Sequence, residues 1–225
     1  MLRLLRRKPR TFDIQVQDLV LRVSVGTDLN EESRAAALSF WEQLHAYALR
    51  NPEVGTSKRP IEVGADAPAI VREMVEAAAA AGVGPMYSFQ GALTDHVGRF
   101  LARQVSEVTV ACGADLFIVA RKRQKLVVHR RESGGAVSVV IEPRPEGVGV
   151  STTLGHRQVG VDALAIVARS CMLADAAAAG VRAILPKEDG FRQALAYLRR
   201  VPGVEGGMLV QGDRVGVAGG VEIVT

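Results

Sequence analysis

Aromatic residues, cysteines and long apolar runs are all scarce in this chain of 225 residues. Aromatic side chains make up only 4% of it, so a nucleic-acid surface built by stacking bases on aromatic rings is not expected. The two cysteines, Cys112 and Cys171, lie far apart without neighbours at metal-ligand spacing, which argues against a disulfide framework and a zinc site. No apolar run is long enough to span a bilayer, and no apolar stretch follows the N-terminal arginines as in a signal peptide. These absences predict a cytoplasmic protein whose partners include neither nucleic acid nor a membrane.

Positive charge is concentrated at the N-terminus. Residues 1–10 carry five basic residues and no acid, and subtracting those five charges from the net charge of +4 leaves −1. We therefore expect a basic tail over 1–10 and a single domain over 11–225, which is long enough to bury a substantial core. A second basic run, RKRQKLVVHRR at 121–131, has the spacing of two hairpin strands with a solvated tip. The alternative interpretation of this basic run is that it contacts phosphate.

Hydrophobic periodicity predicts an α+β fold, with helices packed on a largely antiparallel sheet. The predicted strands form a hairpin that turns near Gln17-Asp18, a four-stranded meander, and a C-terminal group, at 12–25, 106–111, 115–120, 125–130, 136–141 and 206–224. The predicted helices span about 30–49, 68–81, 88–101, 162–180 and 188–200.

Cap residues and polar residues refine the helix predictions. Asp28 or Asn30 is expected to cap the first helix, Gly82 to end the second and Ser88 to open the third. Asp95 is expected to point away from the apolar face of the third helix.

Glycines cluster at three predicted turns. They are Gly82 and Gly84 with Pro85 before a helix, Gly113 between two strands, and Gly147, Gly149 and Gly155 around a Ser-Thr-Thr segment. Exposed backbone amides in such turns bind anions, although glycine is also the ordinary residue of a tight turn. The sequence contains neither a P-loop nor a GxGxxG motif.

Asp175 lies in the apolar helical stretch MLADAAAAG. An unpaired carboxylate buried there would be costly, so we expect Asp175 to have a partner. The partner is either a backbone amide, or a hard cation or polar ligand.

His156 lies in a predicted loop after a strand. An imidazole titrates near neutral pH and serves as acid, base or hydrogen-bond donor, although a lone surface histidine is also common. The order of residues supports no Ser-His-Asp triad.

Three segments together resemble a known family: AGVGPMYSFQGALTDHVGRFL at 81–101, ACGADLFIV at 111–119 and STTLGHRQVGVDALAIVARSCMLADAAAAG at 151–180. They are similar to the uncharacterised protein family UPF0280, a branch of the ApbE-like superfamily of flavin transferases. The resemblance covers most of residues 60–185 and implies an ApbE-like fold in which these loops converge on one cleft. It further implies a phosphorylated or heteroaromatic cofactor, with FAD or FMN as candidates, and Mg²⁺. The implied cation ligands are Asp115 and Asp175, and the implied proton shuttle is His156. The implied cofactor-binding residues are Gly84, Pro85, Gly113, Thr152, Thr153 and Gly155.

Departures from the family pattern weaken the expectation of catalysis. Ala114 stands where relatives have glycine, Ala179 stands where they have threonine, and no His-x-x-Asp-Pro segment is recognisable. We therefore expect a protein that binds a small-molecule cofactor, with at most a weak effect of Mg²⁺. The alternatives are an enzyme of tetrahydromethanopterin-linked one-carbon metabolism, such as a cofactor-modifying transferase, and a structural protein that associates with itself as a homo-oligomer.

Overall fold

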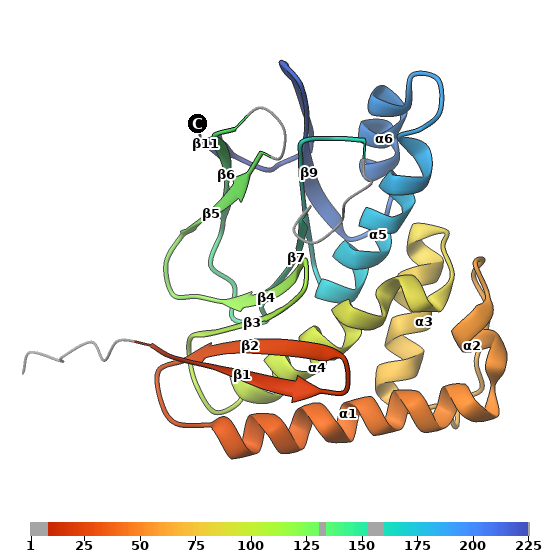
Figure 1. The fold of residues 1–225 in the computed structure, drawn as a ribbon, viewed down its shortest axis with the longest axis vertical. Coiled ribbons are helices and arrows are strands. Elements are labelled where there is room, and N and C mark those ends of the chain that lie inside the picture. Colours follow the sequence, from red (N-terminus) through yellow and green to blue (C-terminus); the bar gives the residue numbers. More distant parts are fainter. Residues whose placement is uncertain (1–8, 131–133, 153–159, 225) are drawn as a thin grey trace, which may run out of the picture.

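The computed structural model describes residues 9–130, 134–152 and 160–224. The chain has an α+β fold, as the periodicity predicts (Figure 1). Arg10, the last residue of the predicted basic tail, is the first residue of strand β1 and pairs with Asp28.

Two antiparallel sheets form the β part of the molecule. The larger sheet has eight strands in the order β1-β2-β3-β4-β7-β8-β9-β10. Their bounds are Arg10–Val16, Leu19–Val25, Val108–Cys112, Asp115–Val119, Val148–Thr152, Ala163–Ala168, Val204–Gln211 and Arg214–Gly219. The smaller sheet has the order β11-β6-β5, with bounds Ile223–Val224, Ala136–Ile141 and Gln124–His129.

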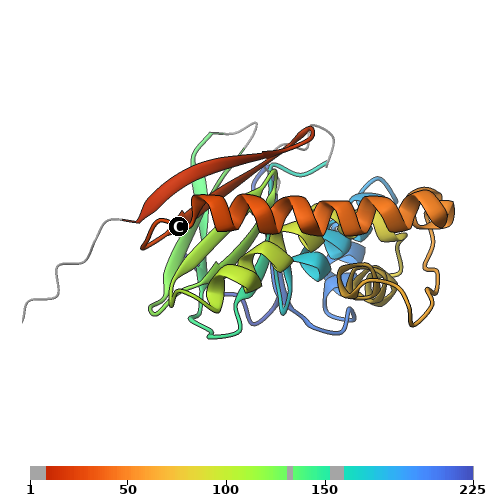
Figure 2. The same cartoon turned by 90° about the horizontal axis from the view of Figure 1, so that it is seen from below.

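The helices lie on one side of the larger sheet and the smaller sheet lies on the other (Figures 1 and 2). The helices are α1, α2, α3, α4, α5 and α6, with bounds Asn30–Arg50, Pro52–Thr56, Ala69–Ala81, Phe89–Ala102, Cys171–Ile184 and Gly190–Leu198. A 3₁₀ helix, η1, spans Pro85–Ser88. In β4, Phe117 packs among residues of the helical side, whereas the next residue, Ile118, packs among residues of the smaller sheet. The central strands of the larger sheet, β4, β7, β8 and β9, are therefore buried on both faces.

Burial on both faces explains the main error of the helix prediction. The stretch predicted as a helix over 162–180 is strand β8 followed by helix α5. All six residues of β8 are buried, with Leu164 on the helical side and Ala165 on the side of the smaller sheet. A strand of this kind has a continuous apolar run, which periodicity cannot distinguish from a buried helix. Helix α5 starts only after Ser170, whose hydroxyl accepts a hydrogen bond from the Leu173 N–H.

The predicted four-stranded meander is also wrong, because its strands belong to two sheets. β3 and β4 form a hairpin in the larger sheet, while β5 and β6 form a hairpin in the smaller one. The basic residues that precede β5 are consequently not a solvated hairpin tip. They lie where the chain crosses between the sheets, and Arg123 pairs there with Glu142 and Glu222.

The local predictions with clear end signals are mostly confirmed. The N-terminal hairpin turns at residues 17–18, and α3 ends at Gly82 in the left-handed conformation. The cap prediction for α1 is wrong, because Leu29 occupies the cap position and no side chain caps the helix. Ser88 does precede α4, but its hydroxyl donates to the Met172 carbonyl oxygen and caps nothing.

Helices α4 and α5 cross in very close contact at Gly91. A Cβ atom at Gly91 would lie 2.5 Å from the Cys171 carbonyl oxygen and 2.8 Å from the Met172 Cα. Only a residue without a side chain allows this approach, and the approach fixes where the polar residues of the two helices meet.

Gly91→Ala should therefore lower the free energy of unfolding by about 1–3 kcal/mol, because the added methyl group forces two packed backbones apart. Urea unfolding measures the change. The matched control is Gly55→Ala in α2, where an added Cβ meets nothing within 4 Å and stability should stay the same or rise slightly. Equal stability of Gly91→Ala and the wild type would contradict the importance of this crossing.

Candidate functional site

Two buried aspartates bind α4 and α5 to each other in a reciprocal way. Asp175 of α5 accepts a hydrogen bond from the Gly91 N–H in the first turn of α4, at 3.1 Å. Asp95 of α4 accepts one from the Cys171 N–H, which begins α5, also at 3.1 Å. A carboxylate at a helix N-terminus satisfies a free N–H and interacts favourably with the helix dipole. The partner expected for Asp175 is thus a backbone amide, whereas the expected orientation of Asp95 is wrong, because Asp95 is only 2% exposed.

Asp115 lies beside Asp175 at the start of β4. It pairs in register with Ser151 of the neighbouring strand β7, and both residues are fully buried. Within the described residues, neither carboxyl oxygen of Asp115 nor the Ser151 hydroxyl has a hydrogen-bond partner of normal geometry. Buried polar groups without partners are rare and costly, so this group of atoms has the character of a binding site.

Burial raises the pKa of both carboxyl groups, and the charge of Asp175 raises that of Asp115 further. Burial, offset by the hydrogen bond from Gly91, raises the pKa of Asp175 to about 7. Burial and the nearby Asp175 raise the pKa of Asp115 well above its ordinary value, while the positive charge of Arg182 acts in the opposite direction on both groups. Near neutral pH the pair therefore holds at least one proton, which can lie between the two carboxyl groups.

The two cysteines lie beside these carboxyl groups and are both free and buried. Burial raises the pKa of the Cys112 thiol to about 12, and it raises the pKa of Cys171 as well. Both thiols are therefore protonated near neutral pH, a state in which a cysteine is neither a nucleophile nor a good metal ligand.

Several residues of the predicted site come together around Asp115. Gly113 forms the β3–β4 turn with a φ of +58°, and a Cβ there would lie 3.2 Å from the Gln90 side-chain oxygen, next to Gly91. Thr152 ends β7 beside Ser151, and its hydroxyl donates to the Ala114 carbonyl oxygen at 3.2 Å. Gly113, Asp115, Thr152 and Asp175 thus meet where β4, β7, α4 and α5 converge.

The remaining predicted residues lie elsewhere or outside the described part of the chain. A Cβ at Gly84 would clash with the Ser57 carbonyl oxygen, and the neighbouring Pro85 is buried where it opens η1. Their part in binding stays a prediction. Thr153, Gly155 and His156 lie outside the described residues.

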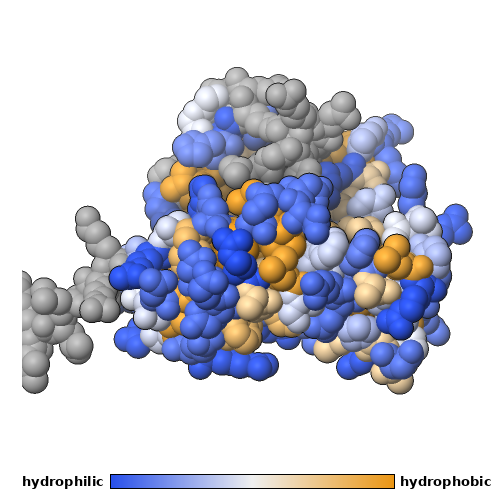
Figure 3. All heavy atoms as spheres, turned by 60° about the horizontal axis from the view of Figure 1, so that its bottom comes forward, coloured by the Kyte–Doolittle hydropathy of each residue, from blue (hydrophilic) through white to orange (hydrophobic). Residues whose placement is uncertain are grey.

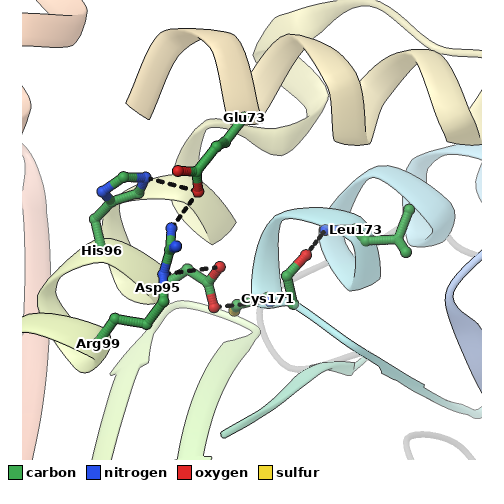
Figure 4. A network of polar contacts seen from close by, with 7 residues as sticks. Glu73, Asp95, His96, Arg99, Cys171 and Leu173 are labelled. Carbon is green, nitrogen blue, oxygen red and sulfur yellow. Dashed lines mark hydrogen bonds and ion pairs between the residues drawn. The ribbon is translucent and has the colours of Figure 1, made fainter. Parts of the chain in front are cut away.

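A polar network behind Asp95 was missed at the level of sequence. Arg99 pairs with Glu73 and lies 3.8 Å from Asp95, and His96 Nε2 is 3.3 Å from the same Glu73 carboxylate (Figure 4). The network joins α3, α4 and the start of α5 beside a cavity of about 270 Å³. Burial lowers the pKa of His96 to about 4 and raises that of Asp95 to about 6. The i, i+4 spacing of Asp95 and Arg99 is the sequence signal that points to this network.

A larger cavity, of about 910 Å³, lies away from the predicted residues. It is lined by Leu116, Ile118 and Leu126, and Ile118 packs on the side of the smaller sheet. None of the predicted site residues lines it. The buried aspartates, with their free polar atoms, are therefore the better candidate site.

The part of the chain that the structure describes contains neither a cluster of metal-ligating side chains nor a membrane-spanning helix. No group of three or more histidine, cysteine, aspartate or glutamate residues there is arranged to hold a metal ion. No helix among the described residues is long and apolar enough to cross a membrane.

The fold defines the chain as an ApbE-like protein. The flavin transferase ApbE from Vibrio cholerae matches with a TM-score of 0.63 and 12% identity, over 94% of this chain and 97% of that one. The flavinyl transferase ApbE of Pseudomonas stutzeri matches with a TM-score of 0.61 and 13% identity, over 96% of both chains. These similarities establish the ApbE-like fold.

Sequence comparison places the chain within this class. The family model described as AbpE bacteria matches residues 3–188. A UPF0280 protein of Methanocaldococcus jannaschii is 31% identical, over 79% of this chain and 77% of that protein. One from Methanopyrus kandleri is 29% identical, over 92% and 88% of the two chains. The chain belongs to the UPF0280 family of ApbE-like proteins, which confirms the resemblance noted from its motifs.

Asp115→Asn should stabilise the protein at pH 8 by about 1–3 kcal/mol, because it removes a carboxyl group whose ionisation is disfavoured by burial and by Asp175, and each unit of raised pKa corresponds to about 1.4 kcal/mol. Because the pKa values of this pair are raised in the folded state, their contribution to stability is complete at low pH. This contribution to stability is lost as the pH rises through the pKa of the folded state, which for Asp175 is about 7. Urea unfolding should therefore show that Asp115→Asn raises the free energy of unfolding relative to the wild type by more at pH 8 than at pH 5.

The control for this experiment is Asp213→Asn in the exposed turn between β9 and β10, which should have little effect at either pH. A gain for Asp115→Asn that is the same at both pH values would show that Asp115 is not an acid with a raised pKa.

Proposed function

We propose that this protein binds a flavin nucleotide, FAD or FMN, where Gly113, Asp115, Thr152 and Asp175 converge. The observation that carries the proposal is the set of buried polar atoms without partners at Asp115 and Ser151. A polar ligand that reaches these atoms offsets the cost of burying them. The ApbE-like fold supports a flavin as that ligand, because its solved relatives are flavin transferases.

Magnesium fits this site only as an ion shared with the ligand. Asp115 and Asp175 offer carboxylate oxygens and Ser151 offers a hydroxyl, which is the oxygen chemistry that Mg²⁺ prefers. One Asp175 oxygen already binds the Gly91 N–H, and Ala179 has no side-chain oxygen. Asp115 and Asp175 would therefore hold a Mg²⁺ whose other ligands are water and phosphate. Such an ion would supply positive charge to the ligand's phosphates.

Binding is a better-supported role for the site than catalysis. His156 is the candidate proton shuttle, and Thr153 and Gly155 are candidate cofactor contacts in the same segment. Ala114 and Ala179 depart from the pattern of the transferases, and they favour a protein that holds its cofactor without transferring part of it. An enzyme of tetrahydromethanopterin-linked one-carbon metabolism remains the alternative within this site, and a cytoplasmic location remains part of the proposal.

A structural role through self-association has less support. The large apolar residues that are exposed belong to separate elements, among them Val20 in β2, Leu49 in α1 and Val215 in β10. On the face shown in Figure 3, hydrophilic residues predominate and apolar residues reach the surface between them. This distribution differs from the continuous apolar patch that marks many stable interfaces.

FAD should bind the full-length chain in titration calorimetry, and Mg²⁺ should strengthen binding by less than about tenfold. Asp175→Asn should remove any magnesium effect and leave the fold intact, because the asparagine oxygen still accepts from Gly91. Ala179→Thr should increase the magnesium effect by adding a ligand oxygen. Asp213→Asn is the control. An absence of flavin binding would refute the proposed function, and tight magnesium binding that does not respond to Ala179 would refute the assigned ligands.

His156→Ala should leave the free energy of unfolding within about 0.5 kcal/mol of the wild type. It should also weaken FAD binding more than about tenfold, because a hydrogen bond to a charged group contributes about 1.5–3 kcal/mol. Binding by the wild type should depend on pH near the imidazole pKa, and this dependence should be absent from the variant. The control is His129→Ala at the exposed end of β5. A variant that is several kcal/mol less stable but binds FAD normally would make His156 a packing residue.

A further inference from the structure

Arg182 of α5 is a half-buried arginine whose guanidinium is not paired within the described residues. Its Nη1 atom is completely buried and has no hydrogen-bond partner, and within the described residues its guanidinium forms no ion pair. Other half-buried arginines are paired: Arg99 binds Glu73 and Arg144 binds Glu205. Asp115 and Asp175 lie near enough to interact with the charge of Arg182, but a buried donor without an acceptor is costly, and an acceptor from a ligand would offset that cost.

The position of Arg182 on α5 places it in the proposed flavin site. Residues 175, 179 and 182 follow the i, i+4, i+7 spacing of one helix face. Asp175 on this face lies beside Asp115, and the charge of Arg182 acts on both carboxyl groups. Ala179, between Asp175 and Arg182, is too small to shield one from the other. The face therefore carries an acid at one end and a free guanidinium at the other.

We infer that Arg182 binds the phosphate of the flavin nucleotide; this inference rests on the proposed function. A guanidinium presents its donors in a planar fork that matches two phosphate oxygens. A phosphate beside two carboxyl groups needs a positive partner, and Arg182 supplies it from the protein. Contact between Arg182 and the phosphate does not require a divalent cation, so the nucleotide binds without magnesium.

A purely structural role for Arg182 predicts a different outcome. Arg182 lies in the last turn of α5, where a positive charge interacts favourably with the helix dipole. In that role its replacement lowers the melting temperature and leaves the preference for phosphorylated ligands unchanged. A role in phosphate binding requires discrimination between ligands with and without phosphate.

The experiment compares FAD, riboflavin and inorganic pyrophosphate by titration calorimetry in EDTA. Arg182→Gln should weaken FAD and pyrophosphate binding by at least about tenfold and leave riboflavin binding unchanged. Arg182→Lys keeps the charge but loses the fork, so its FAD affinity should be intermediate. Arg34→Gln, on the exposed side of α1, is the control for loss of one positive charge. Melting temperatures verify that each variant folds. If Arg182→Gln does not fold, Arg182→Lys is compared with the wild type instead.

Each outcome bears on the inference. Unchanged FAD affinity in the Arg182 variants, or equal losses for FAD and riboflavin, overturns it. Pyrophosphate binding that depends on Arg182, in a protein that binds no flavin, supports the phosphate site and refutes the flavin proposal. A wild-type protein that binds neither FAD nor pyrophosphate refutes both.

Discussion

The crossing of α4 and α5 at Gly91 is the constraint on which the rest of this structure depends. Because Gly91 has no side chain, the two helix starts come close enough for each to bind an aspartate of the other. These bonds satisfy N–H groups that every helix leaves free, and they hold two carboxylates in the interior. The Glu73, His96 and Arg99 network surrounds Asp95 from the side of α3. A packing requirement of the helices thus determines where the acidic groups of the site lie.

Charge balance is the second constraint on the site. Burial disfavours ionisation of both Asp115 and Asp175, and the charge of Asp175 further disfavours ionisation of Asp115. Arg182 lowers the pKa of both groups, but within the described residues its buried Nη1 has no hydrogen-bond partner. The site therefore contains buried atoms of Asp115, Ser151 and Arg182 that make no hydrogen bond of normal geometry. A protein usually retains such a combination for a ligand that complements all of them.

The comparison with solved structures limits what the fold says about activity. The ApbE flavin transferases share this architecture at 12–13% identity, and the chain belongs to the UPF0280 family. A shared fold with different residues at the site is compatible with a different activity.

Features that depend on neighbouring residues can be predicted from the amino-acid sequence. Alternation over residues 12–25 specified the N-terminal hairpin, and apolar spacing followed by Gly82 specified α3 and its end. The apolar surroundings of Asp175 were enough to predict a buried acid with a partner. The three sequence motifs at 81–101, 111–119 and 151–180 were enough to identify the ApbE-like fold.

Features that depend on contacts between distant segments emerge in the folded chain alone. The continuous apolar run of β8 reads as a helix until both faces of the sheet are known to be covered. Pairing of β4 with β7 brings Asp115 beside Ser151, and the crossing at Gly91 turns Asp95 into the interior. The lack of a partner for Arg182 appears only when its surroundings are assembled. Local periodicity records which residues are buried, whereas contacts between segments distant in the chain decide what they are buried against.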